Sequence, residues 1–154
     1  MQNSITDTFT KFDASSLKMG IVVSKFNWDI TSKMLDSAIE MCHFYKIPEQ
    51  NIVIKYAAGS VEIPYILQSL AISEEIDCLV ALGVVIRGDT SHYDYVCKMV
   101  SEGVMNVMLD QHIPVGFGIS TTENKQQAID RISNGGGAVE ASLQALKEGG
   151  LLDE

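Results

Sequence analysis

Four short apolar segments, rich in β-branched residues, recur along the chain and predict buried strands. They are Leu17–Ser24, Asn51–Ala57, Asp77–Ile86 and Pro114–Ser120. Each is a nearly continuous apolar run, not an alternation of apolar and polar positions. A parallel sheet that is covered on both faces requires strands of this kind. The pattern therefore predicts a central four-stranded parallel sheet.

The segments between these strands carry apolar residues at helical spacing. The predicted helices run from about Ile30 to Tyr45, from Val61 to Ile72, from about His92 to Met108, from Gln126 to Ile132 and from Val139 to Leu146. We expect Asp29 or Thr31 to cap the first helix, and Asn134–Gly137 to break the helical pattern before the last one. Such alternation indicates an α/β domain, a three-layer sandwich of the flavodoxin-like type.

The length of 154 residues matches one domain, and 46% hydrophobic with 20% charged residues is an ordinary globular composition. Residues 1–16 show no clear periodicity. We expect them to form either an N-terminal arm, which can add to a neighbour's sheet, or a frayed tail. Residues 17–154 are expected to form a single domain.

Charge and motif content exclude several classes of protein. Eleven basic against 20 acidic residues, a net charge of −9, disfavour nucleic acid and anionic membrane surfaces as partners. A small anionic ligand stays compatible, because one arginine and a few backbone N–H groups suffice for a phosphate. The chain shows no transmembrane run, secretory signal, metal-ligand cluster, dinucleotide fingerprint or P-loop. Three cysteines without a CxxC pair favour reduced thiols in a cytoplasmic protein.

Ligands of open parallel sheets bind outside the carboxyl ends of the strands, so the strand-to-helix junctions are the places to search. The richest junction is Gly83–Tyr95. Gly88 permits a tight turn with positive φ, and the backbone N–H groups that follow favour an anion. Thr90 adds a hydroxyl donor and His92 an imidazole that exchanges protons near neutral pH. The alternative is that this segment merely caps a helix and that His92 is a surface residue.

Three other junctions carry candidates with plain structural alternatives. Phe26 follows the first strand and either stacks on a flat heterocycle or packs onto the next helix. Ser60 is expected to cap a helix, and Glu62 either pairs with ligand N–H groups or favours the helix dipole. Arg131 either forks onto phosphate oxygens or is simply solvated.

Taken together, these junctions resemble the 6,7-dimethyl-8-ribityllumazine synthase family between about Met19 and Leu146. The resemblance rests on Phe26-Asn27, Gly59–Pro64, Leu82–Val96 and Pro114–Arg131. It implies an enzyme that condenses 5-amino-6-(D-ribitylamino)uracil with 3,4-dihydroxy-2-butanone 4-phosphate. The products are 6,7-dimethyl-8-ribityllumazine, phosphate and water, in the penultimate step of riboflavin biosynthesis, without a metal or organic cofactor.

The resemblance also implies a role for each matching residue. It assigns proton transfer to His92 and phosphate binding to Asp89, Thr90 and Arg131. It assigns the aminouracil to Phe26, Ser60, Val61, Glu62, Val84, Val85, Ile86 and Phe117. The family places the last of these across a subunit contact.

The expected partners are the two substrates, further copies of this chain and riboflavin synthase. The resemblance implies a pentamer, which in many members assembles further into an icosahedral shell of 60 subunits. One departure is that Ile132–Gly137 lacks the lysine common in the family. Because of this missing lysine, an alternative function stays open: a non-catalytic protein that binds flavin or lumazine, or that forms a shell. An unrelated flavodoxin-like signalling or nucleotide-binding domain would have no use for the third junction.

Overall fold

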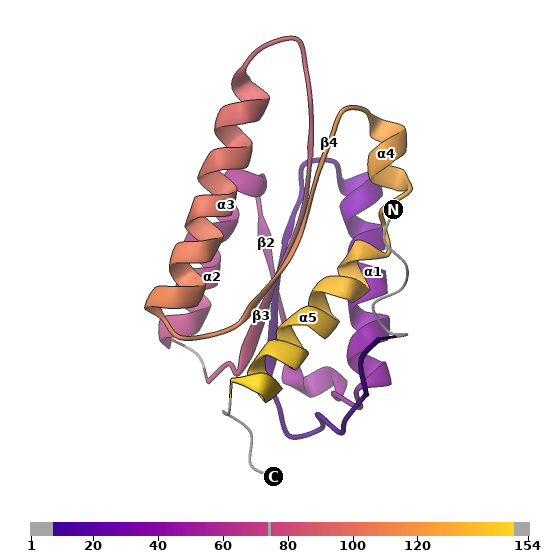
Figure 1. The fold of residues 1–154 in the computed structure, drawn as a ribbon, viewed down its shortest axis with the longest axis vertical. Coiled ribbons are helices and arrows are strands. Elements are labelled where there is room, and N and C mark those ends of the chain that lie inside the picture. Colours follow the sequence, from indigo (N-terminus) through magenta and orange to yellow (C-terminus); the bar gives the residue numbers. More distant parts are fainter. Residues whose placement is uncertain (1–7, 74, 150–154) are drawn as a thin grey trace.

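The computed structural model describes residues 8–73 and 75–149, and its centre is a sheet of four parallel strands in the order β2-β1-β3-β4 (Figure 1). The strands are β1 (Met19–Ser24), β2 (Ile52–Ala57), β3 (Cys78–Ile86) and β4 (Val115–Thr122). The predicted sheet is confirmed, and every strand begins and ends within two residues of its predicted bounds.

Helices cover both faces of this sheet, so the predicted three-layer sandwich is also confirmed (Figure 1). The helices are α1 (Trp28–Phe44), α2 (Ile63–Ser73), α3 (His92–Asp110), α4 (Lys125–Ile129) and α5 (Asn134–Glu148), with 3-10 turns η2 (Glu49–Asn51) and η3 (Ser60–Glu62). Helices α1 and α5 pack on one face and α2 and α3 on the other.

Side chains alternate between the two cores along each strand, as a strand's period of two requires. In β3, Val80 and Leu82 belong to the core under α1 and α5. Their neighbours Leu79 and Ala81 belong to the core under α2 and α3. Both faces of β3 are therefore buried, which explains why its sequence is a continuous apolar run.

The prediction that Asn134–Gly137 breaks the helical pattern is wrong, because α5 begins at Asn134 and contains these glycines. The reason is close packing of backbones. A Cβ atom on Gly135 would lie 2.1 Å from the carbonyl oxygen of Met34 in α1. A Cβ atom on Gly116 of β4 would lie 1.9 Å from the carbonyl oxygen of Ala138 in α5. Glycine here allows two helices and a strand to approach closely.

Two further local predictions are also wrong. Neither Asp29 nor Thr31 caps α1, because Asn27 holds the N-cap position in a left-handed conformation (φ 61°, ψ 40°). Thr31 instead donates its hydroxyl to the Ser24 carbonyl at 2.7 Å, which ties α1 to the end of β1. Gly88 does not adopt the positive φ that its sequence context suggested.

The described part of the predicted arm lies against its own domain. Ala14 is buried, and its N–H donates to the Tyr45 carbonyl at 2.8 Å. Phe12 packs edge-on against Tyr45 with ring centroids 5.2 Å apart, and Gln144 of α5 donates to the Thr10 carbonyl at 3.0 Å. Residues 1–7 lie outside the described part of the chain, so the domain boundary at residue 17 and pairing with a neighbour's sheet stay predictions.

Within the described residues, no helix combines the length and apolar character needed to cross a membrane. No group of three or more His, Cys, Asp or Glu residues there could hold a metal ion.

Candidate active site

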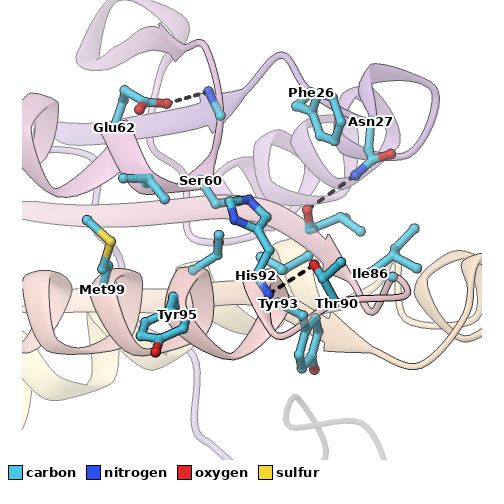
Figure 2. A pocket seen from close by; sticks show the side chains of 16 residues that line it. Phe26, Asn27, Ser60, Glu62, Ile86, Thr90, His92, Tyr93, Tyr95 and Met99 are labelled. Carbon is cyan, nitrogen blue, oxygen red and sulfur yellow. Dashed lines mark hydrogen bonds between the residues drawn. The ribbon is translucent and has the colours of Figure 1, made fainter.

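A cavity of about 780 Å³ opens at the carboxyl ends of the central strands, between η3, the β1–α1 junction and the start of α3 (Figure 2). Nine of the predicted site residues line it: Phe26, Ser60, Val61, Glu62, Val84, Val85, Ile86, Thr90 and His92. Three of the four candidate junctions, which are distant in sequence, therefore meet around a single space.

Backbone hydrogen bonds position the Phe26 ring at the rim of this cavity. The N–H of Phe26 donates to the Ala58 carbonyl at 3.0 Å, and the N–H of Lys25 donates to the Ala57 carbonyl at 2.7 Å. These bonds tie the β1–α1 junction to the β2–η3 junction. The Phe26 residue is 70% exposed. Such exposure disfavours the packing alternative and leaves the ring face free for a flat ligand.

The η3 turn is built around Gly59 and Glu62. The Glu62 carboxylate accepts a hydrogen bond from the Gly59 N–H at 3.0 Å, so it caps its own turn. Gly59 holds the N-cap position and Ser60 is the first residue of the turn, so the prediction that Ser60 is the cap is wrong. Ser60 is nearly buried because Gly83 of β3 lies beneath it, and a Cβ atom on Gly83 would be 2.6 Å from Ser60 Oγ.

The β3–α3 junction places His92 at the first residue of α3. The Thr90 hydroxyl oxygen accepts a hydrogen bond from the His92 N–H at 3.3 Å. Ser91 holds the N-cap position, but its side chain makes no capping hydrogen bond. Figure 2 shows the His92 side chain extending from α3 toward Ser60 of η3. The junction therefore offers an imidazole, two hydroxyls and a helix N-terminus.

Three predicted site residues do not line this cavity. Asp89 is exposed beside it. Phe117 lies on the edge strand β4 and is 46% exposed. Arg131 follows α4, and its guanidinium donates to the Gln127 carbonyl at 2.8 Å. Among the described residues that line the cavity there is no lysine or arginine.

Sequence reasoning missed seven lining residues: Asn27, Gly59, Gly88, Tyr93, Tyr95, Val96 and Met99. A signal for part of this set was present. Tyr95, Val96 and Met99 stand three, four and seven residues after His92, which is the spacing of one helix face.

Asn27 donates its side-chain amide to the Val84 carbonyl at 3.3 Å, so it also fixes the end of β3. Burial is the main reason that the pKa of Tyr93 is raised.

A comparison with known protein families agrees with this geometry. The family model for 6,7-dimethyl-8-ribityllumazine synthase matches residues 16–149, which is most of the chain and includes every residue of the cavity. The chain therefore belongs to the 6,7-dimethyl-8-ribityllumazine synthase family, whose members catalyse the formation of 6,7-dimethyl-8-ribityllumazine in riboflavin biosynthesis.

Proposed function

We propose that this chain condenses 5-amino-6-(D-ribitylamino)uracil with 3,4-dihydroxy-2-butanone 4-phosphate in the cavity around His92. One observation carries the proposal. A single cavity brings together an exposed aromatic ring, a free strand end and a helix N-terminus with an imidazole. These are the groups that a flat heterocycle, its polar edge and a phosphate ester need.

The aminouracil fits the side of the cavity formed by β1, β3 and η3. Phe26 offers a ring face for stacking. The pairing of β3 with β1 ends at Leu82, whereas its pairing with β4 continues to Ile86. Val84 accepts a bond from Asn27 on the β1 side, and alternation along a parallel strand directs the backbone groups of Ile86 to the same side. The backbone groups of Ile86, which lie beyond the end of the pairing with β1, can recognise the edge of the uracil.

The ribityl chain and the apolar part of the heterocycle fit the remaining walls. Ser60, Val61 and Glu62 follow one another along η3 and line the cavity together. They present a hydroxyl, an apolar surface and a carboxylate. A polyhydroxy chain requires hydroxyl and carboxylate partners of this kind.

The butanone phosphate fits the start of α3. Backbone N–H groups at a helix N-terminus and the Thr90 hydroxyl favour an anion. The cavity of one chain contributes no cationic side chain among its described lining residues. We assign the missing positive charge to Arg131 and an apolar wall to Phe117, both from a neighbouring copy, with Asp89 contributing through its backbone.

The shared site requires further copies of the chain, and the family resemblance implies a pentamer. Helices α2 and α3 expose large apolar residues on their outer surfaces: Tyr65, Ile72, Tyr95, Met99, Met105 and Leu109. Contact with further copies would bury this surface. Light scattering should give a mass near five chains, and a monomer mass would contradict the shared site. A shell of 60 subunits and association with riboflavin synthase are further proposals.

The reaction joins an amine to a ketone as an imine, eliminates phosphate and closes the ring. Each step moves a proton, and His92 lies between the two proposed substrate positions, where it can accept and return one. Holding both substrates in one cavity replaces an encounter in solution and supplies a large part of the rate. The phosphate site also stabilises the leaving group as it departs.

The test is the rise of lumazine fluorescence when the protein meets both substrates, compared with the uncatalysed background. We expect acceleration, and His92→Ala should lower kcat by about 10²- to 10⁴-fold while product affinity is kept. His43→Ala is the matched control, because His43 lies on the surface near the end of α1 and pairs with Glu49. Its rate should not change.

One observation favours a second candidate, a non-catalytic lumazine- or flavin-binding protein or shell. The segment Ile132–Gly137 lacks lysine, so the phosphate site has one cation fewer than the resemblance implies. The same assay separates the two. Tight binding of the product lumazine without acceleration would favour the binding protein.

A further inference from the structure

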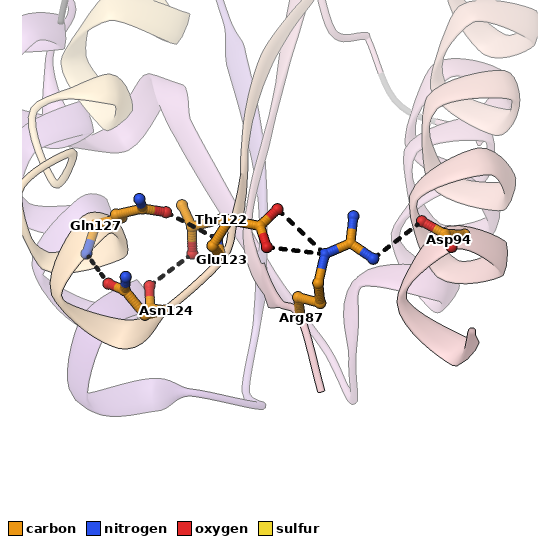
Figure 3. A network of polar contacts seen from close by, with 6 residues as sticks. All are labelled: Arg87, Asp94, Thr122, Glu123, Asn124 and Gln127. Carbon is orange, nitrogen blue, oxygen red and sulfur yellow. Dashed lines mark hydrogen bonds and ion pairs between the residues drawn. The ribbon is translucent and has the colours of Figure 1, made fainter. Parts of the chain in front are cut away.

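Arg87 directly follows the last residue of β3, and its guanidinium lies between the carboxylates of Glu123 and Asp94 (Figure 3). Its Nε lies 3.0 and 3.1 Å from the two carboxylate oxygens of Glu123, in the β4–α4 turn. Its Nη1 lies 3.6 Å from Asp94 Oδ1 in the first turn of α3. Its Cζ lies 4.3 Å from the centroid of the Tyr93 ring. One guanidinium thus joins two separate elements to the end of β3.

The Glu123 side of this network is itself held in place (Figure 3). The N–H of Glu123 donates to Gln127 Oε1 at 2.8 Å, and the N–H of Gln127 donates to Asn124 Oδ1 at 2.9 Å. The Thr122 hydroxyl donates to the Asn124 carbonyl at 2.9 Å. Arg87 is therefore attached to a turn that its own hydrogen bonds already fix.

The loop that Arg87 spans has few other contacts. Residues 88–92 are all exposed, and a Cβ atom on Gly88 would meet nothing within 4 Å. Within residues 88–92, one hydrogen bond involves a side chain, and in it the His92 N–H donates to the Thr90 hydroxyl oxygen. Arg87 stands at one end of this loop, and Tyr93 and Asp94 stand at the other. Its side chain therefore connects the two ends of the segment that carries Thr90 and His92.

Direct binding of the phosphate by Arg87 is the competing explanation. Arg87 is not among the residues that line the cavity. Its charge is already opposed by the carboxylates of Glu123 and Asp94, and the hydrogen bond to Glu123 is the main reason that the pKa of Arg87 is raised. An arginine with two carboxylate partners has little net attraction left for an anion.

We infer that Arg87 is a positioning residue, which holds Thr90 and His92 in place through Glu123 and Asp94 and does not bind the phosphate itself. This inference rests on the proposed function of the site. Arginine suits the role because its planar fork can pair with Glu123 and Asp94 while it stacks on Tyr93, and lysine cannot do this.

The experiment compares Arg87→Ala, Arg87→Lys, Glu123→Gln and the double variant Arg87→Ala/Glu123→Gln with the unmodified chain. The control is Lys125→Gln, which breaks the exposed 2.7 Å ion pair between Lys125 and Asp29. For each protein, kcat, both KM values and the melting temperature are measured. Hydrogen exchange of the amides of residues 88–92 is followed in parallel.

We expect Arg87→Ala to lower kcat by about ten- to a hundredfold, the scale of a misplaced catalytic group. The KM for the butanone phosphate should rise and that for the aminouracil should not. Glu123→Gln should change kcat in the same direction, the double variant should be no slower than Arg87→Ala, and Arg87→Lys should recover only part of the rate. Residues 88–92 should exchange faster, while melting shifts no more than in Lys125→Gln.

Three results would overturn the inference. Unchanged kcat in Arg87→Ala would remove the positioning role. Faster turnover or tighter inhibition by inorganic phosphate in Glu123→Gln would show that Arg87 is a phosphate ligand restrained by Glu123. Unchanged exchange of residues 88–92 would show that Arg87 does not hold the loop.

If the unmodified chain proves inactive, the proposed function fails, and the exchange measurement still decides whether Arg87 holds the loop. If Arg87→Ala does not fold, Arg87→Lys and Glu123→Gln carry the test.

Discussion

Gly135 of α5 lies against the backbone carbonyl of Met34 in α1, so closely that a Cβ atom on Gly135 would be 2.1 Å from that oxygen. No side-chain rotation relieves such a contact, because both partners are backbone. The glycine is therefore needed for the distance between the two helices that cover one face of the sheet.

Replacement of Gly135 by alanine should destabilise the protein by about 2 kcal/mol. Because neither backbone can move aside, we take the overpacking cost at the upper end of its usual range, about 3 kcal/mol, and the gain of about 1 kcal/mol that alanine has over glycine in a helix leaves about 2 kcal/mol. Urea unfolding measures the difference. Gly136→Ala is the matched control, because its Cβ would lie 3.1 Å from Ser37 Oγ and 3.2 Å from the Ser37 carbonyl oxygen, contacts that a much smaller shift relieves. An equal loss in both variants would contradict the packing argument.

Replacement of Tyr45 by phenylalanine should also destabilise the protein. Tyr45 donates its hydroxyl to Glu140 and accepts from Gln144 at 3.1 Å, and both Tyr45 and Glu140 are fully buried. The other carboxylate oxygen of Glu140 has no hydrogen-bond partner among the described residues. Loss of the hydroxyl leaves a buried charge poorly satisfied, which costs about 1–3 kcal/mol.

Chemical denaturation of Tyr45→Phe measures this cost. Tyr56→Phe is the control, because Tyr56 is half exposed and should lose little. The variant Tyr45→Phe/Glu140→Gln should recover part of the stability, since the amide no longer carries the charge. A Tyr45→Phe protein as stable as the unmodified chain would show that Lys11, whose Nζ lies 3.7 Å from Glu140, satisfies the carboxylate alone.

The sheet and its covering helices could be predicted because their signal is local. The continuous apolar run of β3 indicates a strand that is buried on both faces, and the helical spacing of apolar residues in α1 indicates a helix that is buried on one face. The role of Gly135 could not be predicted in this way. Its reason is a contact with Met34, about a hundred positions earlier, which local propensity does not record.

The candidate site was predictable to the extent that fold rules place it. The carboxyl ends of parallel strands converge, so Phe26, Ser60 and His92 were expected to meet, and they do. Phe117 was grouped with them through the family resemblance, and Arg131 through the chemistry of an arginine near the fourth junction and the resemblance together. In the described chain they lie outside the cavity, because the geometry within one chain does not bring them together.

Replacement of Gly83 by alanine should disturb the aminouracil site without touching the substrate. The new Cβ would be 2.6 Å from Ser60 Oγ and 3.1 Å from Ile119 Cδ1. Ser60, which lines the cavity, must then shift, and we expect the KM for the aminouracil to rise about tenfold, which is about 1.4 kcal/mol of binding. Steady-state kinetics with each substrate varied in turn measures this change.

A second variant tests the cause of that effect. Ser60→Ala removes the hydroxyl that Gly83→Ala would meet, so the double variant should bind the aminouracil better than Gly83→Ala alone. If the two substitutions instead raise the KM independently, the contact between Gly83 and Ser60 does not set the position of η3.

The stability of the protein should fall as the pH rises above about 9. Burial raises the pKa of the Cys42 thiol from its ordinary 9.0 to about 12, and burial together with Glu140 raises the pKa of Tyr45 from 10.0 to about 12. Burial also raises the pKa of Cys78. A group whose pKa is higher in the folded state contributes its full stability below the unfolded pKa and loses it as the pH approaches the folded value.

The unfolded chain therefore releases protons that the folded chain keeps, in a window between about pH 9 and pH 12. Each such group lowers the free energy of unfolding by up to about 1.4 kcal/mol per pH unit in that window. Urea unfolding from pH 7 to pH 10.5, with a reducing agent present, measures the slope. Cys42→Ala should be less stable at pH 7, because a buried sulfur is lost, yet its stability should fall less steeply above pH 9. Equal slopes in the two proteins would show that the Cys42 thiol ionises as readily in the folded chain as in the unfolded one.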